Sequence, residues 1–141
     1  MAEARERVGV DGLSEWLGIR WDAADRARLE VRPELINPAG LLSGGVTYAL
    51  VDYVMGSALW MQRESGERIA TIGIAINYVH TAREGEIVCE ARVRRRNDRV
   101  AVLEAEVHDA QGRLLADAIG SFSIFPRERL GKHDRGPSRQ V

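Results

Sequence analysis

Residues 41–62 read LLSGGVTYALVDYVMGSALWMQ, and this stretch decides the fold. Apolar side chains fall on nearly every side of a helix built from it, and such a helix is wrapped by other elements. The stretch is long enough to span a bilayer, but a central Asp52 costs roughly 2.5–3.5 kcal/mol there. We therefore expect a buried helix of a globular protein and no membrane partner. It should begin after an N-cap at Ser43 and end at about Gln62.

The segments around this helix read as strands. Residues 26–32 alternate apolar and charged side chains, which is typical of a half-buried strand. After Glu67 a meander of strands joined by turns follows, at residues 69–80, 87–96, 101–108 and 114–125. Within residues 69–80, alternation places Thr71 on the face opposite Ile72 and Tyr78. This order of elements predicts an α+β fold in which one antiparallel sheet wraps one long helix.

Length and composition bound the class of protein. The 141 residues suit one domain, which we place at residues 11–126, between flexible segments at 1–10 and 127–141. With 20 Lys+Arg and 21 Asp+Glu, the chain lacks the positive charge of a strongly basic nucleic-acid binder. The single cysteine, Cys89, excludes an internal disulfide and a zinc site built on several thiolates. No export signal is visible in residues 1–7, so we expect a cytoplasmic protein.

One charged side chain interrupts the apolar segment. From Leu35 to Gln62 the only charge is Asp52. A lone carboxylate among apolar residues is a costly placement unless it is paired. Asp52 therefore either pairs with another element as a structural residue or is retained for function, and both interpretations stay open.

The start of the helix is a second candidate feature. Free backbone N–H groups at a helix N-terminus, beside glycines that allow close approach, form an oxyanion site, although Ser43-Gly44-Gly45 also suits an ordinary capped start. Asp52 lies eight residues after Gly44, which is roughly 12 Å of helical rise. One small reacting group cannot contact both from within one chain. If both serve one site, the site lies between two copies, which predicts a homodimer.

These residues together resemble a known family. The motif Asn37-x-x-Gly40-x-x-Ser43-Gly44-Gly45, followed by Asp52, is similar to the signature of PaaI-type hot-dog-fold acyl-CoA thioesterases. The resemblance covers roughly residues 13–125. It implies the hot-dog fold, a dimer or a dimer of dimers, and hydrolysis of an acyl-CoA thioester at the dimer interface.

The resemblance also implies a role for each matching residue. The backbone N–H of Gly44 would polarise the thioester carbonyl, and Asn37 would position the carbonyl or the water. Asp52 from the other subunit would act as nucleophile or general base. Thr71 falls where some relatives carry a hydroxyl that holds the attacking water. No metal and no cofactor are required by this mechanism.

One position departs from the family pattern. Ser43 stands where the family usually has histidine, and serine supplies no imidazole. The alternative function is therefore a weakly active or non-catalytic acyl-CoA-binding protein. We expect substrate contacts from Ser43 and Gly45 at the helix start, and from Tyr48 and Met55 near the Asp52 face.

A basic run on the meander has two interpretations. Arg92, Arg94, Arg95, Arg96 and Arg99 lie at the hairpin around residues 97–98. They would either receive the phosphates of CoA or form the solvated face of an edge hairpin, and the second interpretation is favoured.

Overall fold

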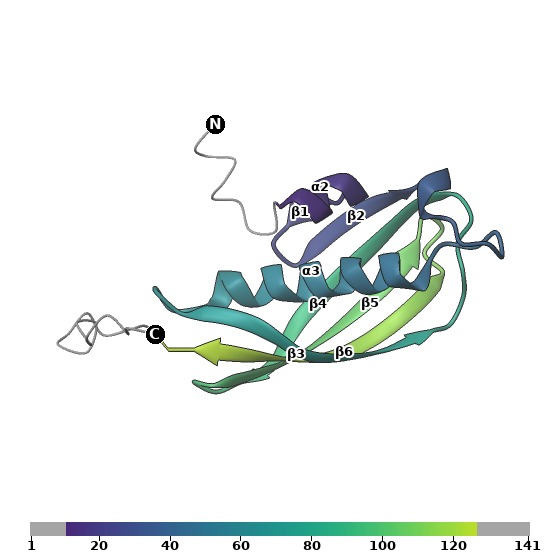
Figure 1. Cartoon of the computed structure of the whole chain (residues 1–141). Coiled ribbons are helices and arrows are strands. Elements are labelled where there is room, and N and C mark those ends of the chain that lie inside the picture. The colour runs from purple at the N-terminus through teal and green to yellow at the C-terminus, as the bar shows by residue number, and fades with distance from the viewer. Residues whose placement is uncertain (1–10, 127–141) are drawn as a thin grey trace, which may run out of the picture.

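One antiparallel sheet curves along one long helix (Figure 1). The computed structural model describes residues 11–126, and the predicted flexible segments at 1–10 and 127–141 lie outside the described residues. The elements in chain order are α2 (Gly12–Leu17), β1 (Arg20–Ala23), β2 (Arg26–Val31), the 3-10 helix η1 (Pro33–Leu35), α3 (Gly44–Gln62), β3 (Arg68–Tyr78), β4 (Gly85–Arg96), β5 (Val100–Asp109) and β6 (Leu114–Phe125). The strand order is β1-β2-β4-β5-β6-β3. This confirms the predicted α+β architecture.

The core lies between α3 and the sheet. Leu50, Val54 and Leu59 of α3 have no exposed surface, and neither have Leu29 and Leu103 on the facing strands. Full burial of one such side chain stabilises the fold by about 1.5–3 kcal/mol. The helix is therefore held at a fixed position over the sheet, and the residues on its outer side are held with it.

The apolar pattern predicts that other elements wrap α3 on all sides. Within residues 11–126 they leave part of its outer side exposed. On the outer side of α3, Gly45, Tyr48 and Trp60 keep exposed surface, and so does Asp52 on the flank next to β3. Within residues 11–126, no helix combines the length and the hydropathy of a membrane span.

Strand β3 forms an edge of the sheet and contains a β-bulge. Its register against β6 shifts between Thr71 and Gly73, so that Ile72 is the extra residue. Thr71 pairs with Phe122, whose side chain is only 2% exposed in the core, and Thr71 therefore faces α3. The predicted placement of Thr71 opposite Tyr78 is wrong because the bulge resets the alternation. Ile72 is left 60% exposed.

Helix α2 is attached to α3 through its N-cap. The carboxylate of Asp11 accepts the N–H of Ser14 at 2.8 Å and the O–H of Tyr53 at 2.9 Å. Burial and the nearby Asp11 carboxylate raise the pKa of Tyr53 to about 12. Tyr53 is thus a neutral hydrogen-bond donor at any physiological pH, and it holds α2 beside the middle of α3.

Candidate active site

Asp52 and Thr71 form the first half of the candidate site. The hydroxyl of Thr71 donates to Oδ1 of Asp52 at 2.7 Å, from β3 across to the middle of α3. Among residues 11–126, no cation pairs with Asp52, and Thr71 is its only hydrogen-bond partner. A carboxylate that accepts one hydrogen bond keeps further lone pairs for a water molecule. The structure thus pairs Asp52 with a neutral hydroxyl and leaves its charge uncompensated.

The start of α3 forms the second half. Ser43 is the N-cap residue, as predicted, but its side chain makes no cap hydrogen bond. The helix starts instead with a backbone hydrogen bond, in which the carbonyl of Ser43 accepts the N–H of Val46 at 3.0 Å. The N–H of Gly44 lies in the first turn, where no intrahelical acceptor exists, and it has no partner among residues 11–126. This N–H is available to a ligand.

Tyr78 is a site residue that the strand pattern alone did not reveal. Its O–H donates to the carbonyl oxygen of Gly44 at 2.6 Å, which joins the end of β3 to the start of α3. A side chain at position 44 would place its Cβ 3.2 Å from the Tyr78 ring and hydroxyl, so glycine fits here without displacement. Burial, and to a lesser degree the nearby Tyr48, raises the pKa of Tyr78. The tyrosine remains a neutral donor.

A cavity of about 490 Å³ opens at the Gly44 end of α3. Asn37, Gly44, Thr47 and Tyr78 are among its lining residues. The side-chain carbonyl of Asn37 accepts the backbone N–H groups of residues 39 and 41 at 3.0 and 3.1 Å. Those two bonds hold the loop in place. Because the side-chain oxygen of Asn37 accepts both of them, its NH₂ group is left to donate. Asn37 is therefore suited to hold a carbonyl oxygen.

The two halves are separate within one chain. Asn37 and Gly44 line the cavity, whereas Asp52 and Thr71 do not. This is the separation that the helical spacing of Gly44 and Asp52 predicts.

The predicted substrate contacts divide into two groups. Gly45 is exposed and Tyr48 is half-buried, and both lie on the outer side of α3. Met55 instead has no exposed surface. It points to the sheet, where a Cβ on Gly120 would lie 2.7 Å from its sulfur. The structure places Met55 in the core rather than at the site, and the predicted substrate contact from Met55 is wrong.

The arginines of the β4–β5 hairpin are largely paired. Arg92 and Arg94 form ion pairs with Glu104, and Arg96 lies 3.2 Å from a carboxylate oxygen of Glu67. The sequence interpretation placed this hairpin at an edge of the sheet. That placement is wrong, because β4 and β5 are interior strands. Paired guanidinium groups favour the interpretation of a solvated face over a phosphate site.

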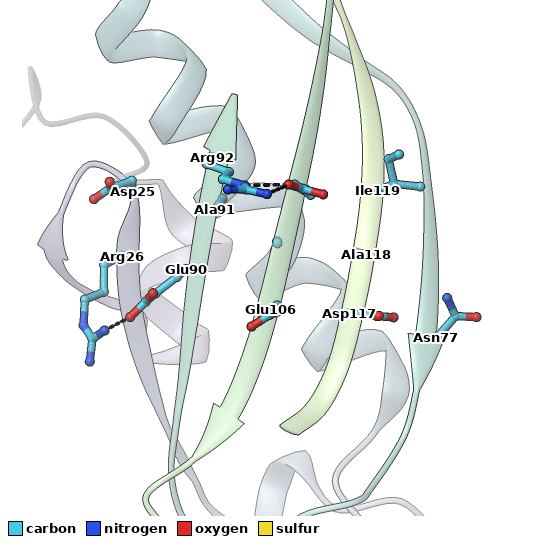
Figure 2. A pocket seen from close by; sticks show the side chains of 12 residues that line it. Asp25, Arg26, Asn77, Glu90, Ala91, Arg92, Glu106, Asp117, Ala118 and Ile119 are labelled. Carbon is cyan, nitrogen blue, oxygen red and sulfur yellow. Dashed lines mark hydrogen bonds and ion pairs between the residues drawn. The ribbon is translucent and has the colours of Figure 1, made fainter. Parts of the chain in front are cut away.

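A larger cavity, of about 850 Å³, lies on the opposite face of the sheet. Figure 2 shows that charged side chains line it, with Arg26 paired to Glu90 and Arg92 paired to a carboxylate of the next strand. None of the predicted catalytic and helix residues lines this cavity, and the one candidate phosphate residue that does, Arg92, is paired with Glu104. We therefore assign the candidate active site to the helix side of the sheet.

The sequence and the fold of this chain are similar to those of known proteins. Residues 39–116 match the sequence model of the thioesterase superfamily. The chain belongs to the thioesterase superfamily. This membership confirms the predicted hot-dog fold and makes the protein a thioester hydrolase. The PaaI subtype stays a prediction.

Three relatives illustrate how far the likeness of this thioesterase-superfamily chain extends. It is 28% identical over 116 residues to the 1,4-dihydroxy-2-naphthoyl-CoA hydrolase of Escherichia coli K12, covering 79% of this chain and 85% of that protein. The structure of the conserved protein PA5202 from Pseudomonas aeruginosa is 30% identical, with a TM-score of 0.78, and covers 86% of this chain and 99% of that chain. The BH2602 protein from Bacillus halodurans, solved with CoA, is 27% identical with a TM-score of 0.79 and coverages of 88% and 82%.

Proposed function

We propose that this protein hydrolyses an acyl-CoA thioester to the free acid and CoA, at a site shared between two copies of the chain. The observation that carries the proposal is the carboxylate of Asp52, which Thr71 orients at 2.7 Å and which no cation neutralises among residues 11–126. The CoA found with BH2602 and the naphthoyl-CoA substrate of the E. coli relative support an acyl-CoA as the substrate class. A cytoplasmic location remains a prediction.

The Gly44 end of α3 would bind the thioester carbonyl. The N–H of Gly44 lies at the positive end of the dipole of a 19-residue helix, where negative charge is stabilised. A carbonyl oxygen that becomes an oxyanion gains more from this donor than the ground state does. The free amide of Asn37 lines the same cavity and supplies a second donor.

Asp52 of the second copy would act on the carbonyl carbon. In one route, Asp52 accepts a proton from a water molecule while the water oxygen attacks that carbon. In the other route, the carboxylate attacks, CoA leaves, and water hydrolyses the resulting anhydride. Both routes remain open. A single turnover in ¹⁸O-labelled water separates them, because only the second route places solvent oxygen in the Asp52 side chain.

Two features support the assignment of the halves to different copies. The side of α3 that carries Tyr48 and Asp52 is only partly covered by residues 11–126, since both residues keep exposed surface. Within residues 11–126, strand β3 has a neighbouring strand, β6, along one of its edges, and it is the last strand of the sheet on its other edge. A second copy that pairs along β3 would bring its own Asp52 toward the Gly44 cavity. A dimer, or a dimer of dimers, is the expected assembly.

The second candidate function is acyl-CoA binding with little or no turnover. Ser43 favours it, because this side chain makes no cap hydrogen bond and supplies no imidazole at the helix start. The two functions differ in one measurable respect, namely whether free CoA thiol is released. A sharp rise in thiol release in Ser43→His would identify the serine as the cause of weak activity.

The experiment that tests the proposal is thiol release from a panel of aromatic and aliphatic acyl-CoA esters. Asp52→Asn should lose at least about 100-fold in kcat. Asp117→Asn, on the opposite face of the sheet, is the matched control and should keep wild-type activity. Thiol release that is absent from the wild type, with CoA-ester binding retained, would favour the binding protein. Full activity in Asp52→Asn would overturn the mechanism.

A further inference from the structure

His80 lies at the rim of the Gly44 cavity. Two anchors hold this part of the backbone. The O–H of Tyr78 binds the carbonyl of Gly44 at 2.6 Å, and the N–H groups of Val79 and His80 both donate to the carbonyl of Leu115, at 2.8 and 3.1 Å. His80 lines the same cavity as Asn37 and Gly44. Its distance from the helix start is therefore set by the fold.

One residue of the cavity lining, His80, is of the type that most often serves as a general acid or base in enzymes. The lining residues are Asn37, Leu41, Leu42, Gly44, Thr47, Tyr78, Val79, His80, Thr81, Ala82 and Leu115. They include no carboxylate, lysine or arginine. The hydroxyl of Tyr78 is committed to Gly44, and burial raises its pKa. Only histidine in this set is suited to donate a proton in the reaction.

Thioester hydrolysis can use such a donor on the carbonyl side of the site. If the N–H of Gly44 binds the carbonyl oxygen, then the leaving sulfur, which is bonded to the same carbon, also lies in this cavity. In the general-base route, Asp52 of the second copy takes up the proton of the attacking water. In either route the CoA sulfur ends as a thiol, and a proton donor at the carbonyl half of the site can supply that proton as the C–S bond breaks.

We propose that His80 is a catalytic residue that protonates the departing CoA sulfur. This proposal rests on the proposed function. In the step, the C–S bond breaks, its electron pair goes to sulfur, and the oxyanion re-forms the C=O bond. The proton moves from the imidazolium of His80 to sulfur. Solvent then returns a proton to the imidazole, and Asp52 releases the proton of the water.

The test compares two leaving groups in His80→Asn and His80→Gln. The first substrate is an acyl-CoA that the wild type hydrolyses, and the second is the 5-thio-2-nitrobenzoate ester of the same acid, whose acidic thiol needs no proton donor. We expect kcat to fall about 100-fold on the CoA ester and to stay within about threefold on the activated ester. His108→Asn is the matched control, since His108 lies on β5 beside Glu106, outside the cavity. It should match the wild type on both esters.

Two results would contradict a role of His80 as proton donor. Wild-type kcat on the CoA ester in both His80 variants would overturn the proposal, and so would an equal loss on the two esters, which is the signature of a positioning or structural role. A circular dichroism melt of each variant identifies any loss of fold. Failure of the proposed function gives a different result, because the wild type would then release no thiol, or Asp52→Asn would remain active.

Discussion

Replacement of Thr71 by valine removes the hydrogen bond that orients Asp52 and keeps the branched shape of the side chain. The bond joins Oγ1 of Thr71 to Oδ1 of Asp52 over 2.7 Å. Hydrogen bonds to charged groups contribute about 1.5–3 kcal/mol, and the exposure of Thr71 places this one near the lower end. Since about 1.4 kcal/mol is a factor of ten in rate, we expect kcat to fall roughly tenfold in Thr71→Val, with KM little changed.

The fold should tolerate this change. Thr71 is exposed on an edge strand, and valine is a good strand former, so the free energy of unfolding should change by less than about 0.5 kcal/mol. Urea denaturation of Thr71→Val and of the wild type checks this expectation. A large loss of stability would mean that the fall in kcat cannot be assigned to the orientation of Asp52.

Two further variants isolate the hydrogen bond. Thr71→Ser keeps the hydroxyl and should retain at least about a third of the wild-type kcat. In the Asp52→Asn background, Thr71→Val should cause no further loss, because the bond has no carboxylate to orient. The reasoning is refuted if Thr71→Val keeps wild-type kcat, or if its loss is the same with and without Asp52.

Three other predictions concern the fold. Asp11→Ala should lower the free energy of unfolding by about 1 kcal/mol at neutral pH, because Asp11 caps α2. The backbone N–H of Ser14 holds the pKa of Asp11 below 3.8, so its contribution is present above that value and is lost as the pH falls through the lower, folded pKa. Denaturation curves of the wild type and Asp11→Ala at pH 7 and at about pH 2 check this. The prediction is contradicted if the difference between their free energies of unfolding does not become smaller in acid. Gly120→Ala should cost about 1–3 kcal/mol, since its Cβ would lie 2.7 Å from the sulfur of Met55. Gly73→Ala, with nothing within 4 Å, is the control, and equal costs in the two would refute the argument. Burial raises the pKa of the Cys89 thiol to about 12, so thiol reagents should label it only after unfolding, and rapid labelling of the native protein would contradict its place in the core.

The ends of several elements could be predicted from the sequence because local signals mark them. The helix ends at Gln62, where the apolar run ends, and begins directly after Ser43, at the paired glycines. Strand β6 covers the predicted residues 114–125, since Pro126 cannot continue it. In contrast, β1 has four residues and no clear alternation, and the sequence did not predict it.

The orientation of side chains in the site depends on contacts that no local pattern records. The isoleucines of β3 alternate so regularly that they conceal the bulge at Ile72, which is visible only in the pairing with β6. Met55 lies three residues after Asp52, but the direction in which each points is set by how α3 packs on the sheet. Tyr78 likewise becomes a site residue only because the end of β3 meets Gly44.

The most direct test of a site shared between two copies is complementation between two inactive variants. Asp52→Asn removes the carboxylate, and Gly44→Ala places a methyl group 3.2 Å from the ring of Tyr78 at the oxyanion half. Each variant alone should be inactive in thiol release. After the two are unfolded and refolded together, mixed dimers hold one intact site, and an equal mixture should recover about a quarter of the wild-type activity. Recovery near that level would support the shared site, whereas no recovery from a mixture shown to contain mixed dimers would contradict it.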